Sequence, residues 1–348
     1  MEEYKLNERD KAILRYVIHQ FILTANPVGS RNISKKYALG LSPATIRNIM
    51  ADLEEMGLLG HPHTSAGRVP TDKGYRFYVD SLMETPLLDS ESKTFLDNSF
   101  NVQSSETEEL LKITALLLGD ITNQIALISY PKFENAVLTK IQIVSLSSSR
   151  ILVIISIDSG LVRTITLEIN VEVNEDNIFY VQQFLNEKLS GLRFSEIRET
   201  IKDRIKDFNR DDYKPIIRVF LDSVDKIFTD FSSSEKSFIT GTKNILRQPE
   251  FEDFQQLKGV IELVENKEVI VHIMDNRAEL TRGDVAITIG GENMEEKLNE
   301  FSVITKNYDL GGGVGTVGIM GPKRMEYSKI IAAVVYAADL LTKELRKK

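Results

Sequence analysis

The chain has 348 residues, of which 42% are hydrophobic and 27% charged, and this balance and length indicate a globular protein of two or three domains rather than a disordered one. Its apolar stretches are far shorter than the ~20 residues of a membrane span, its charged N-terminus has no signal-peptide core, and we expect a cytoplasmic protein without membrane association. The absence of cysteine excludes disulfides and cysteine-based metal sites.

Charge is distributed unevenly along the chain. The net charge of −8 argues against a nucleic-acid-binding protein when taken as one number. Residues 1–85, however, contain 11 basic and 10 acidic residues, a net +1 that leaves −9 for the remainder. Between Asn26 and Arg76 there are 7 basic and 4 acidic residues. This asymmetry is typical of a DNA-binding module on an acidic body, because only the surface facing phosphate needs positive charge.

The first 40 residues predict two helices. Asn7, followed by Asp10 three positions later, is a typical N-cap, and apolar residues at helical spacing follow it. Asn26-Pro27 ends this first helix. A short second helix is predicted over Ser30–Tyr37, with a turn at Leu39–Leu41.

A third helix is predicted from Pro43 to about Met56. Ser42 is a favourable N-cap, and proline at the first helical position loses no hydrogen bond. Gly57 is suited to the left-handed conformation that ends many helices. Ile46, Ile49, Met50 and Leu53 share one face, which we expect to be buried.

The third helix also has a polarised charge. Arg47 and Asn48 lie in its first half, whereas Asp52, Glu54 and Glu55 lie in its second half. A helix that enters the major groove by its N-terminal half needs this order, because donors and the positive end of the helix dipole then meet DNA.

Residues 58–83 predict a β-hairpin followed by a fourth helix. The strands are Leu58–His61 and Arg68–Thr71, and the helix is Asp72–Met83. The hairpin tip is rich in small residues and hydrogen-bond donors that suit phosphate or minor-groove contacts. The alternative for this segment is a small helical domain that binds protein; the basic hairpin favours DNA.

Twelve polar residues are candidates for DNA contact: Ser30, Arg31, Ser42, Thr45, Arg47, Asn48, His63, Thr64, Ser65, Arg68, Lys73 and Arg76. Ser42, Thr45, Arg47 and Asn48 are expected in the groove, and the others at phosphates or in the hairpin. Arg47 is the best candidate for reading guanine, because a bidentate arginine–guanine contact gives about 1–3 kcal/mol of discrimination.

The following segment predicts a polar connector at Asp89–Glu106 and a long amphipathic helix at Glu108–Ile128. Three strands with short turns then predict an antiparallel meander: Thr139–Leu146, Ile151–Asp158 and Leu161–Ile169.

The rest of the chain alternates between helical and strand patterns. Three helices come first, at Asp176–Leu189, Phe194–Phe208 and Tyr213–Phe231. Strands return at Val269–Met274, Val285–Ile289, Ser302–Asp309 and Val314–Met320, before a final helix from Met325 to about Leu345. This order indicates an α+β body.

Six sequence motifs resemble those of the heat-inducible transcription repressor HrcA family, and the resemblance spans most of the chain. They are Pro27–Arg31, Leu41–Met50, Asp52–Leu58, Pro62–Asp72, Gly74–Asp80 and Gly318–Tyr327. The resemblance implies a multidomain α+β fold with an N-terminal winged helix-turn-helix at 1–85. It further implies a GAF-like α+β domain, formed with a linker helix by 86–136 and 236–348, and an inserted α+β dimerisation domain at 137–235.

The same resemblance implies a homodimeric repressor of chaperone operons. Such a repressor binds double-stranded operator DNA at an inverted repeat, is helped into its active fold by chaperonin and is lost from the operator on heat stress. A regulator gated by a small ligand in the GAF-like domain is the alternative.

Three further patterns favour structural interpretations, and we expect no enzyme, cofactor or metal site. Gly313–Gly318 matches the dinucleotide motif G-x-G-x-x-G but leads into a strand, which favours a glycine-rich hairpin. His61 and His63 have no nearby acidic residue or cysteine to complete a zinc site. Gly290–Asn293 is interpreted as a structural turn.

Overall fold

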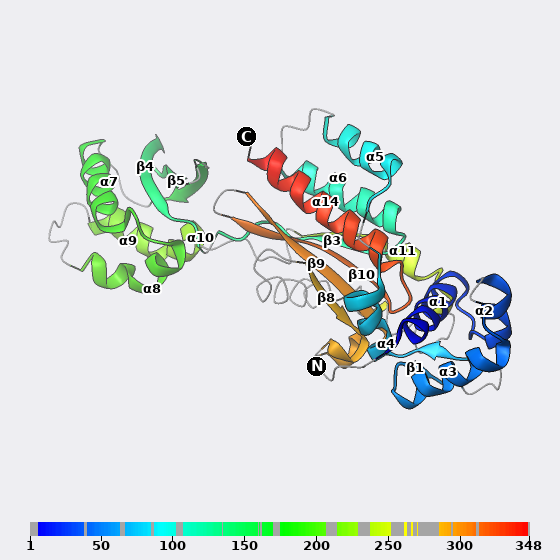
Figure 1. The fold of residues 1–348 in the computed structure, drawn as a ribbon. Helices are drawn as coiled ribbons and strands as arrows, with labels where there is room; N and C mark the ends of the chain where they lie inside the picture. The colour runs from blue at the N-terminus through cyan, green and yellow to red at the C-terminus, as the bar shows by residue number, and fades with distance from the viewer. Residues whose placement is uncertain are drawn as a thin grey trace. The chain divides into compact units, whose positions relative to one another are not determined.

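The computed structural model of the chain describes most of its residues, namely 6–37, 40–62, 67–84, 87–101, 107–133, 135–158, 160, 162–169, 175–206, 214–228, 237–251, 261–262, 266, 270, 285–293, 295–310 and 313–346. These residues fall into two compact units. Unit 1 comprises Met1–Ile128, Phe238–Asn307 and Thr316–Leu340, and unit 2 comprises Ser129–Ser237, Tyr308–Gly315 and Leu341–Lys348. Both combine helices with antiparallel strands (Figure 1), which confirms the predicted α+β class.

The head of unit 1, residues 6–84, consists of helices and one short hairpin. Its elements are α1 (Glu8–Thr24), α2 (Ser30–Lys36), α3 (Pro43–Glu55), β1 (Leu59–Gly60), β2 (Val69–Pro70), α4 (Asp72–Phe77) and the π-helical turn η1 (Tyr78–Leu82). The fourth helix was predicted to run to Met83. Instead its last turn is π-helical, because the Met83 N–H bonds to the Tyr78 carbonyl five residues earlier, at 2.8 Å.

Three predicted helix boundaries of the head are confirmed. The Asn7 carboxamide accepts from the N–H groups of Arg9 and Asp10 at 2.9 and 3.0 Å, and Ser42 Oγ accepts from the Thr45 N–H at 3.1 Å. Gly57, just beyond α3, has a φ of +74°, where only glycine is unstrained. These features fix the start of α1 and both ends of α3.

The body of unit 1 is built on a five-stranded sheet in the order β7-β3-β10-β9-β8. The strands are β3 (Ile125–Ile128), β7 (Phe238–Thr240), β8 (Ala286–Ile289), β9 (Phe301–Asp309) and β10 (Val314–Pro322). The helices are α5 (Ser90–Asn101), α6 (Thr107–Thr122), α11 (Thr242–Ile245), α14 (Tyr327–Leu345) and the short 3-10 turns η3 (Pro249–Phe251), η4 (Gly290–Glu292) and η5 (Glu296–Leu298). Helices α5, α6 and α14 lie on one face of the sheet (Figure 1).

Two sequence predictions for this body were wrong. The helix predicted over Glu108–Ile128 ends at Thr122, because Asn123 adopts a left-handed φ of 52° and Ile125–Ile128 is buried between two neighbouring strands. The predicted connector at Asp89–Glu106 contains α5, whose start is capped by the Asp89 carboxylate accepting from the Ser92 N–H at 2.8 Å. Pairing with distant strands makes Ile125–Ile128 a strand despite its helical apolar pattern. The cap at Asp89 starts a helix in a segment whose sequence is polar.

Strand β7 was not predicted. The strand predicted at Val269–Met274 lies outside the described residues, apart from the buried Ile270.

In the described part of unit 2, a three-stranded sheet packs against helices. The strands are β4 (Leu138–Ser147), β5 (Arg150–Ile157) and β6 (Val162–Glu168), in the order β4-β5-β6, which confirms the predicted meander. The helices are α7 (Glu175–Leu189), α8 (Phe194–Arg204), α9 (Lys214–Asp222) and α10 (Val224–Phe228). The last two divide at Ser223 a helix that was predicted to be continuous.

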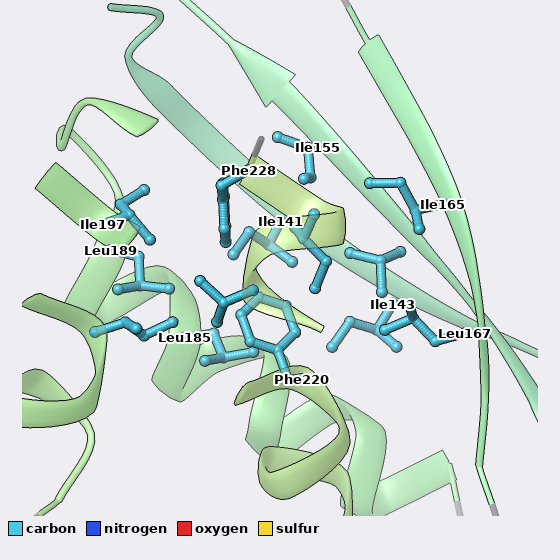
Figure 2. Close-up of a cluster of buried hydrophobic side chains, with 14 of the residues drawn as sticks. Ile141, Ile143, Ile155, Ile165, Leu167, Leu185, Leu189, Ile197, Phe220 and Phe228 are labelled. Atoms are coloured by element: carbon cyan, nitrogen blue, oxygen red, sulfur yellow. The ribbon is translucent and has the colours of Figure 1, made fainter. Parts of the chain in front are cut away.

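One face of this sheet buries its side chains against the helices (Figure 2). Alternate strand residues such as Ile141, Ile155 and Ile165 meet Leu185 and Phe220 in a single cluster. Alternation with period two places the intervening residues on the opposite face.

Strand β4 is an edge of the sheet, and α7 covers its free backbone groups. Asn186 Oδ1 accepts from the Ile141 N–H at 2.8 Å, and Asn186 Nδ2 donates to the Ile141 carbonyl at 2.8 Å. Gln182 Oε1 accepts from the Ile143 N–H at 2.8 Å. These bonds protect the edge from pairing with another strand.

The glycine motif Gly313–Gly318 leads into β10, as predicted, and opens no helix. A Cβ atom at Gly315 would lie 2.4 Å from the Tyr308 ring, and one at Gly313 would lie 2.5 Å from the Phe133 ring. The glycines therefore make room for aromatic rings, and the dinucleotide interpretation lacks the strand-to-helix turn it requires. Among the described helices, none has the length and apolar character needed to cross a bilayer.

Candidate nucleic-acid interface

Helix α3 divides cleanly into a buried face and an exposed face. Ile46, Met50 and Leu53 are buried against the rest of the head. The four predicted groove residues, Ser42, Thr45, Arg47 and Asn48, are all exposed on its first two turns. The structure therefore presents the N-terminal half of α3 to solvent together with its polar side chains.

An open groove of about 830 Å³ adjoins this surface. It is lined by the start of α2, by α3 and by the base of the hairpin: Pro27, Val28, Gly29, Ser30, Arg31, Asn32, Arg47, Met50, Gly67 and Arg68. Three arginines and no acidic residue occur in this described lining. Arg68 is paired with Glu54, so the positive charge of the groove comes mainly from Arg31 and Arg47, although the whole chain is acidic.

The groove combines residues from separate parts of the head. Arg31 and Arg47 are exposed, whereas Ser30 is buried with only 8% of its surface accessible. Asn32 also lines the groove and was missed in the sequence; its only signal was its position beside Arg31 at the start of α2. At the start of α2, the groove therefore includes a polar residue that was not among the predicted contacts.

Arg68 is held in place by its side chain and its backbone. Its Nη2 lies 2.7 Å from Glu54 Oε2 on α3, and its backbone N–H and carbonyl both bond to Val28, at 3.0 and 2.9 Å. A Cβ atom at Gly67 would lie 2.8 Å from the Pro27 carbonyl carbon. The base of the hairpin is therefore packed closely against the chain that precedes α2.

Glu54 also reaches a histidine of the hairpin, with its Oε1 3.6 Å from His61 Nδ1. In the sequence Glu54 was recognisable only as part of an acidic helix end. In the structure it connects α3 to the hairpin, which no sequence spacing indicated.

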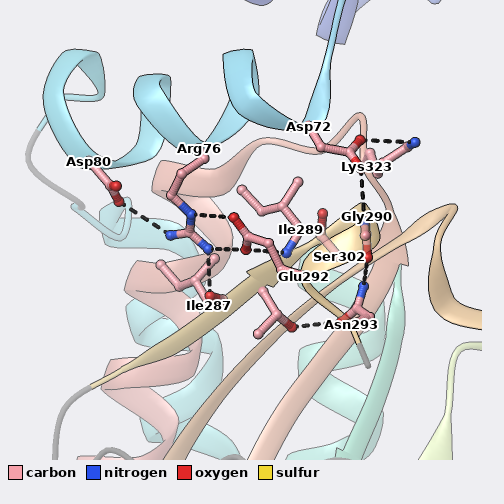
Figure 3. A network of polar contacts seen from close by, with 12 residues as sticks. Asp72, Arg76, Asp80, Ile287, Ile289, Gly290, Glu292, Asn293, Ser302 and Lys323 are labelled. Atoms are coloured by element: carbon pink, nitrogen blue, oxygen red, sulfur yellow. Dashed lines mark hydrogen bonds and ion pairs between the residues drawn. The ribbon is translucent and has the colours of Figure 1, made fainter. Parts of the chain in front are cut away.

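The remaining predicted residues have different environments. Lys73 is exposed on α4. His63, Thr64 and Ser65, at the hairpin tip, lie outside the described residues. Arg76 does not line the groove: its guanidinium forms an ion pair with Glu292 and donates to the Ile287 carbonyl at 2.7 Å (Figure 3). The hydrogen bond to Glu292 raises the pKa of Arg76.

Comparison with known proteins assigns the chain to a family. Residues 108–331 match the model of the HrcA protein C-terminal domain. The heat-inducible transcription repressor HrcA of Chlorobium phaeobacteroides (strain BS1) is 39% identical, covering 98% of this chain and 99% of the relative. That of Chlorobaculum tepidum is 40% identical, covering 98% of both.

A solved structure supports the fold independently. The crystal structure of a hypothetical protein at 2.2 Å resolution matches 99% of both chains with a TM-score of 0.58, at 22% identity. The relatives are named as repressors of transcription, which agrees with the prediction of a regulatory protein rather than an enzyme. From the family match over its body and the full-length similarity to these repressors, the chain belongs to the HrcA family of heat-inducible transcription repressors.

Proposed function

We propose that the chain represses chaperone operons by binding an inverted-repeat operator through a winged helix-turn-helix formed by the head. In this proposal α3 enters the major groove, the β1–β2 hairpin is the wing, and Arg31, Arg47 and Arg68 contact DNA. The observation that carries the proposal is the groove between α2, α3 and the hairpin, whose described lining contains three arginines and no acid.

The orientation of α3 supports this role. Its first turn contains no acidic residue, and Asp52 and Glu55 are exposed only near its far end. The positive end of the helix dipole therefore coincides with Arg47 and Asn48, which suits an approach to the polyanion from the N-terminal side.

Titration of the purified chain onto two DNA fragments tests this function. One fragment contains the inverted repeat upstream of a chaperone operon, and the other has the same composition in scrambled order. Affinity for the first is expected to be about a thousandfold or more higher, the range of sequence-specific regulators. Equal affinity for both would exclude an operator-reading role.

The wing is expected to act mainly on the DNA backbone. Arg68→Ala should lower affinity for operator and scrambled DNA alike and reduce the slope of log affinity against log salt by about 0.9 for each phosphate that the side chain neutralises. Arg68→Lys, which retains the charge, is the matched control and should retain most of the slope. A slope unchanged in Arg68→Ala would show that the wing stays off the DNA.

We further propose that two copies associate through unit 2, with residues 137–235 as the inserted dimerisation domain and residues 86–136 and 236–348 as a GAF-like domain with its linker helix. The support is the outer face of the β4–β6 sheet, where Val144, Leu146 and Val162 have between 45 and 58% of their surfaces exposed. Leu152 of β5 is half-buried opposite Val144, and Ile154 is half-buried between Gln142 and Thr164 on the same face. A sheet face that exposes several large apolar residues among neutral polar ones suits a second copy, and a two-fold dimer presents two heads to two half-sites.

A charge on this face is therefore expected to separate the subunits. Ile154→Glu should change the sedimentation of the chain from dimer to monomer, because an unpaired carboxylate would be buried in the contact. Phe179→Glu places the same charge at an exposed position on α7 and is the control. A variant at Ile154 that still sediments as a dimer would remove this face from the proposal.

Chaperonin is a proposed partner on the family resemblance alone. The ligand-gated alternative has one favourable observation, an open groove of about 590 Å³ lined in part by Tyr16, Tyr37 and Tyr78. That groove is lined by residues of the head, by Leu87 and Asp89, and by the start of α14, but not by the interior of the sheet, and we therefore favour the first proposal.

A further inference from the structure

We propose that Asp72 and Arg76 of α4, together with the loop Gly290–Glu292, form a latch that fixes the head on the five-stranded sheet and thereby sets the half-site spacing that the repressor accepts. This inference rests on the proposed function. It assigns Arg76 and Glu292 as positioning residues that act through the head, without contacting DNA.

The first part of the latch is the arginine. Arg76 directs Nε to Glu292 Oε1 at 2.8 Å and Nη2 to the other oxygen of the same carboxylate, so the two planar groups pair in a bidentate manner (Figure 3). Its remaining terminal nitrogen lies 3.2 Å from Asp80 Oδ1, and Nη2 also reaches the Ile287 carbonyl. A guanidinium paired with a carboxylate through two nitrogens fixes the relative orientation of the two groups as well as their distance.

The second part is the N-terminal end of α4. The Asp72 carboxylate accepts from the Gly291 N–H at 2.8 Å and from Lys323 Nζ at 3.1 Å. Gly290 has a φ of +55°, and a Cβ atom there would lie only 2.1 Å from Asp72 Oδ2. The loop therefore admits the carboxylate only because no side chain is present at this position.

The loop that receives α4 is braced independently of the head. Glu292 Oε2 accepts from the Ile289 N–H at 2.9 Å, which orients the carboxylate toward Arg76. The Nδ2 atom of Asn293, which is buried, lies 2.8, 2.9 and 2.7 Å from the carbonyl oxygens of Gly290, Leu298 and Phe301, which share its two N–H donors. Supporting hydrogen bonds of this kind hold a recognition loop in its binding geometry.

A second contact holds the head at α1. Arg324, whose side chain is only 13% exposed, pairs with Glu250 and donates to the Ile22 carbonyl at the end of α1 at 2.6 Å. Between the two contacts, Tyr75 of α4 is buried with its ring centroid 5.9 Å from that of Tyr327. The head is thus held at two separated points, which prevents rotation about either one.

This arrangement is better suited to specifying geometry than to adding stability. Partly buried ion pairs contribute little net free energy, because desolvation offsets attraction, but they discriminate strongly between orientations. Adding one base pair between two half-sites moves them apart by about 3.4 Å and rotates one by about a tenth of a turn. A dimer whose heads are fixed to the sheet must distort itself or the DNA to bind at the altered spacing. A dimer whose heads can turn on the sheet need not.

The test measures affinity for a series of operators whose spacer is one or two base pairs longer or shorter than the natural one. The affinity of the full-length wild type is expected to fall about tenfold or more with each altered spacer. The affinities of Glu292→Gln and Arg76→Lys should fall about threefold or less. A base substitution inside one half-site should lower the affinity of wild type and of both variants by the same factor, because neither variant changes α3.

Asp339→Asn is the matched control. It breaks the ion pair of Asp339 with Lys306, 3.1 Å apart in the same unit but away from α4, and should keep the wild-type spacing profile. If affinity depended on spacer length in both latch variants as it does in wild type, the latch would be overturned. The same holds if the affinity of wild type did not depend on spacer length. Operator binding would remain established in both cases. Failure of wild type to bind the inverted repeat at all would instead overturn the proposed function.

Discussion

Arg47→Ala is expected to weaken operator binding by roughly 5- to 150-fold for each half-site that Arg47 reads, while leaving the fold and the proposed dimer intact. Arg47 is exposed on α3 and lines the positive groove, and no ion pair with another described residue holds it within the head. Its donors are therefore available for a base. The range follows from removing one bidentate interaction with guanine, about 1–3 kcal/mol. Fluorescence anisotropy with labelled operator measures the change.

The control separates base reading from general loss of charge. Arg218→Ala removes an arginine that is 84% exposed on α9 of unit 2, far from the head in sequence, and should leave operator affinity unchanged. Arg47→Ala should also reduce the preference for the operator over scrambled DNA, since alanine cannot hydrogen-bond to a base. An unchanged preference with lowered affinity for both would reassign Arg47 to a phosphate.

Phe220→Ala is expected to lower the free energy of unfolding of unit 2 by about 3–5 kcal/mol, the usual cost of truncating a buried phenylalanine. Phe220 is 1% exposed at the centre of the cluster in Figure 2, and its ring centroid lies 6.0 Å from that of Phe228. Truncation leaves a cavity bounded by both the sheet and the helices. Urea unfolding, followed by near-ultraviolet circular dichroism at fixed protein concentration, measures the loss.

Phe179→Ala provides the matched comparison, because this phenylalanine is 54% exposed on α7 of the same unit. Its truncation removes little buried surface and should change the free energy of unfolding by less than about 0.5 kcal/mol. Similar losses for both variants would mean that the cluster around Phe220 is not the stabilising core of unit 2.

The sequence predicted the elements whose signals are local. The caps at Asn7 and Ser42 and the glycine at Gly57 lie within a few residues of the backbone they organise, and each is found as expected. The meander β4–β6 was predicted for the same reason, since alternation with period two and short turns are properties of contiguous residues.

What the sequence did not predict depends on partners that are distant in the chain. Ile125–Ile128 continues the apolar pattern of α6 and becomes a strand only because β7 and β10 pair with it from more than a hundred residues away. Arg76 was predicted to contact phosphate from its charge and position, and its pairing with Glu292, 216 residues further on, could not be predicted from either. The three groove arginines were each predicted, whereas their common groove required the fold.

A hydroxyl-radical footprint of the full-length chain on the DNA upstream of the chaperone operon that it is proposed to repress tests the central claim most directly. Two heads that read a palindrome are expected to protect two half-sites of equal length, related by two-fold symmetry, with the interval between them left accessible to cleavage. Protection of a single asymmetric stretch, or no protection at concentrations that saturate binding, would contradict operator recognition by paired heads.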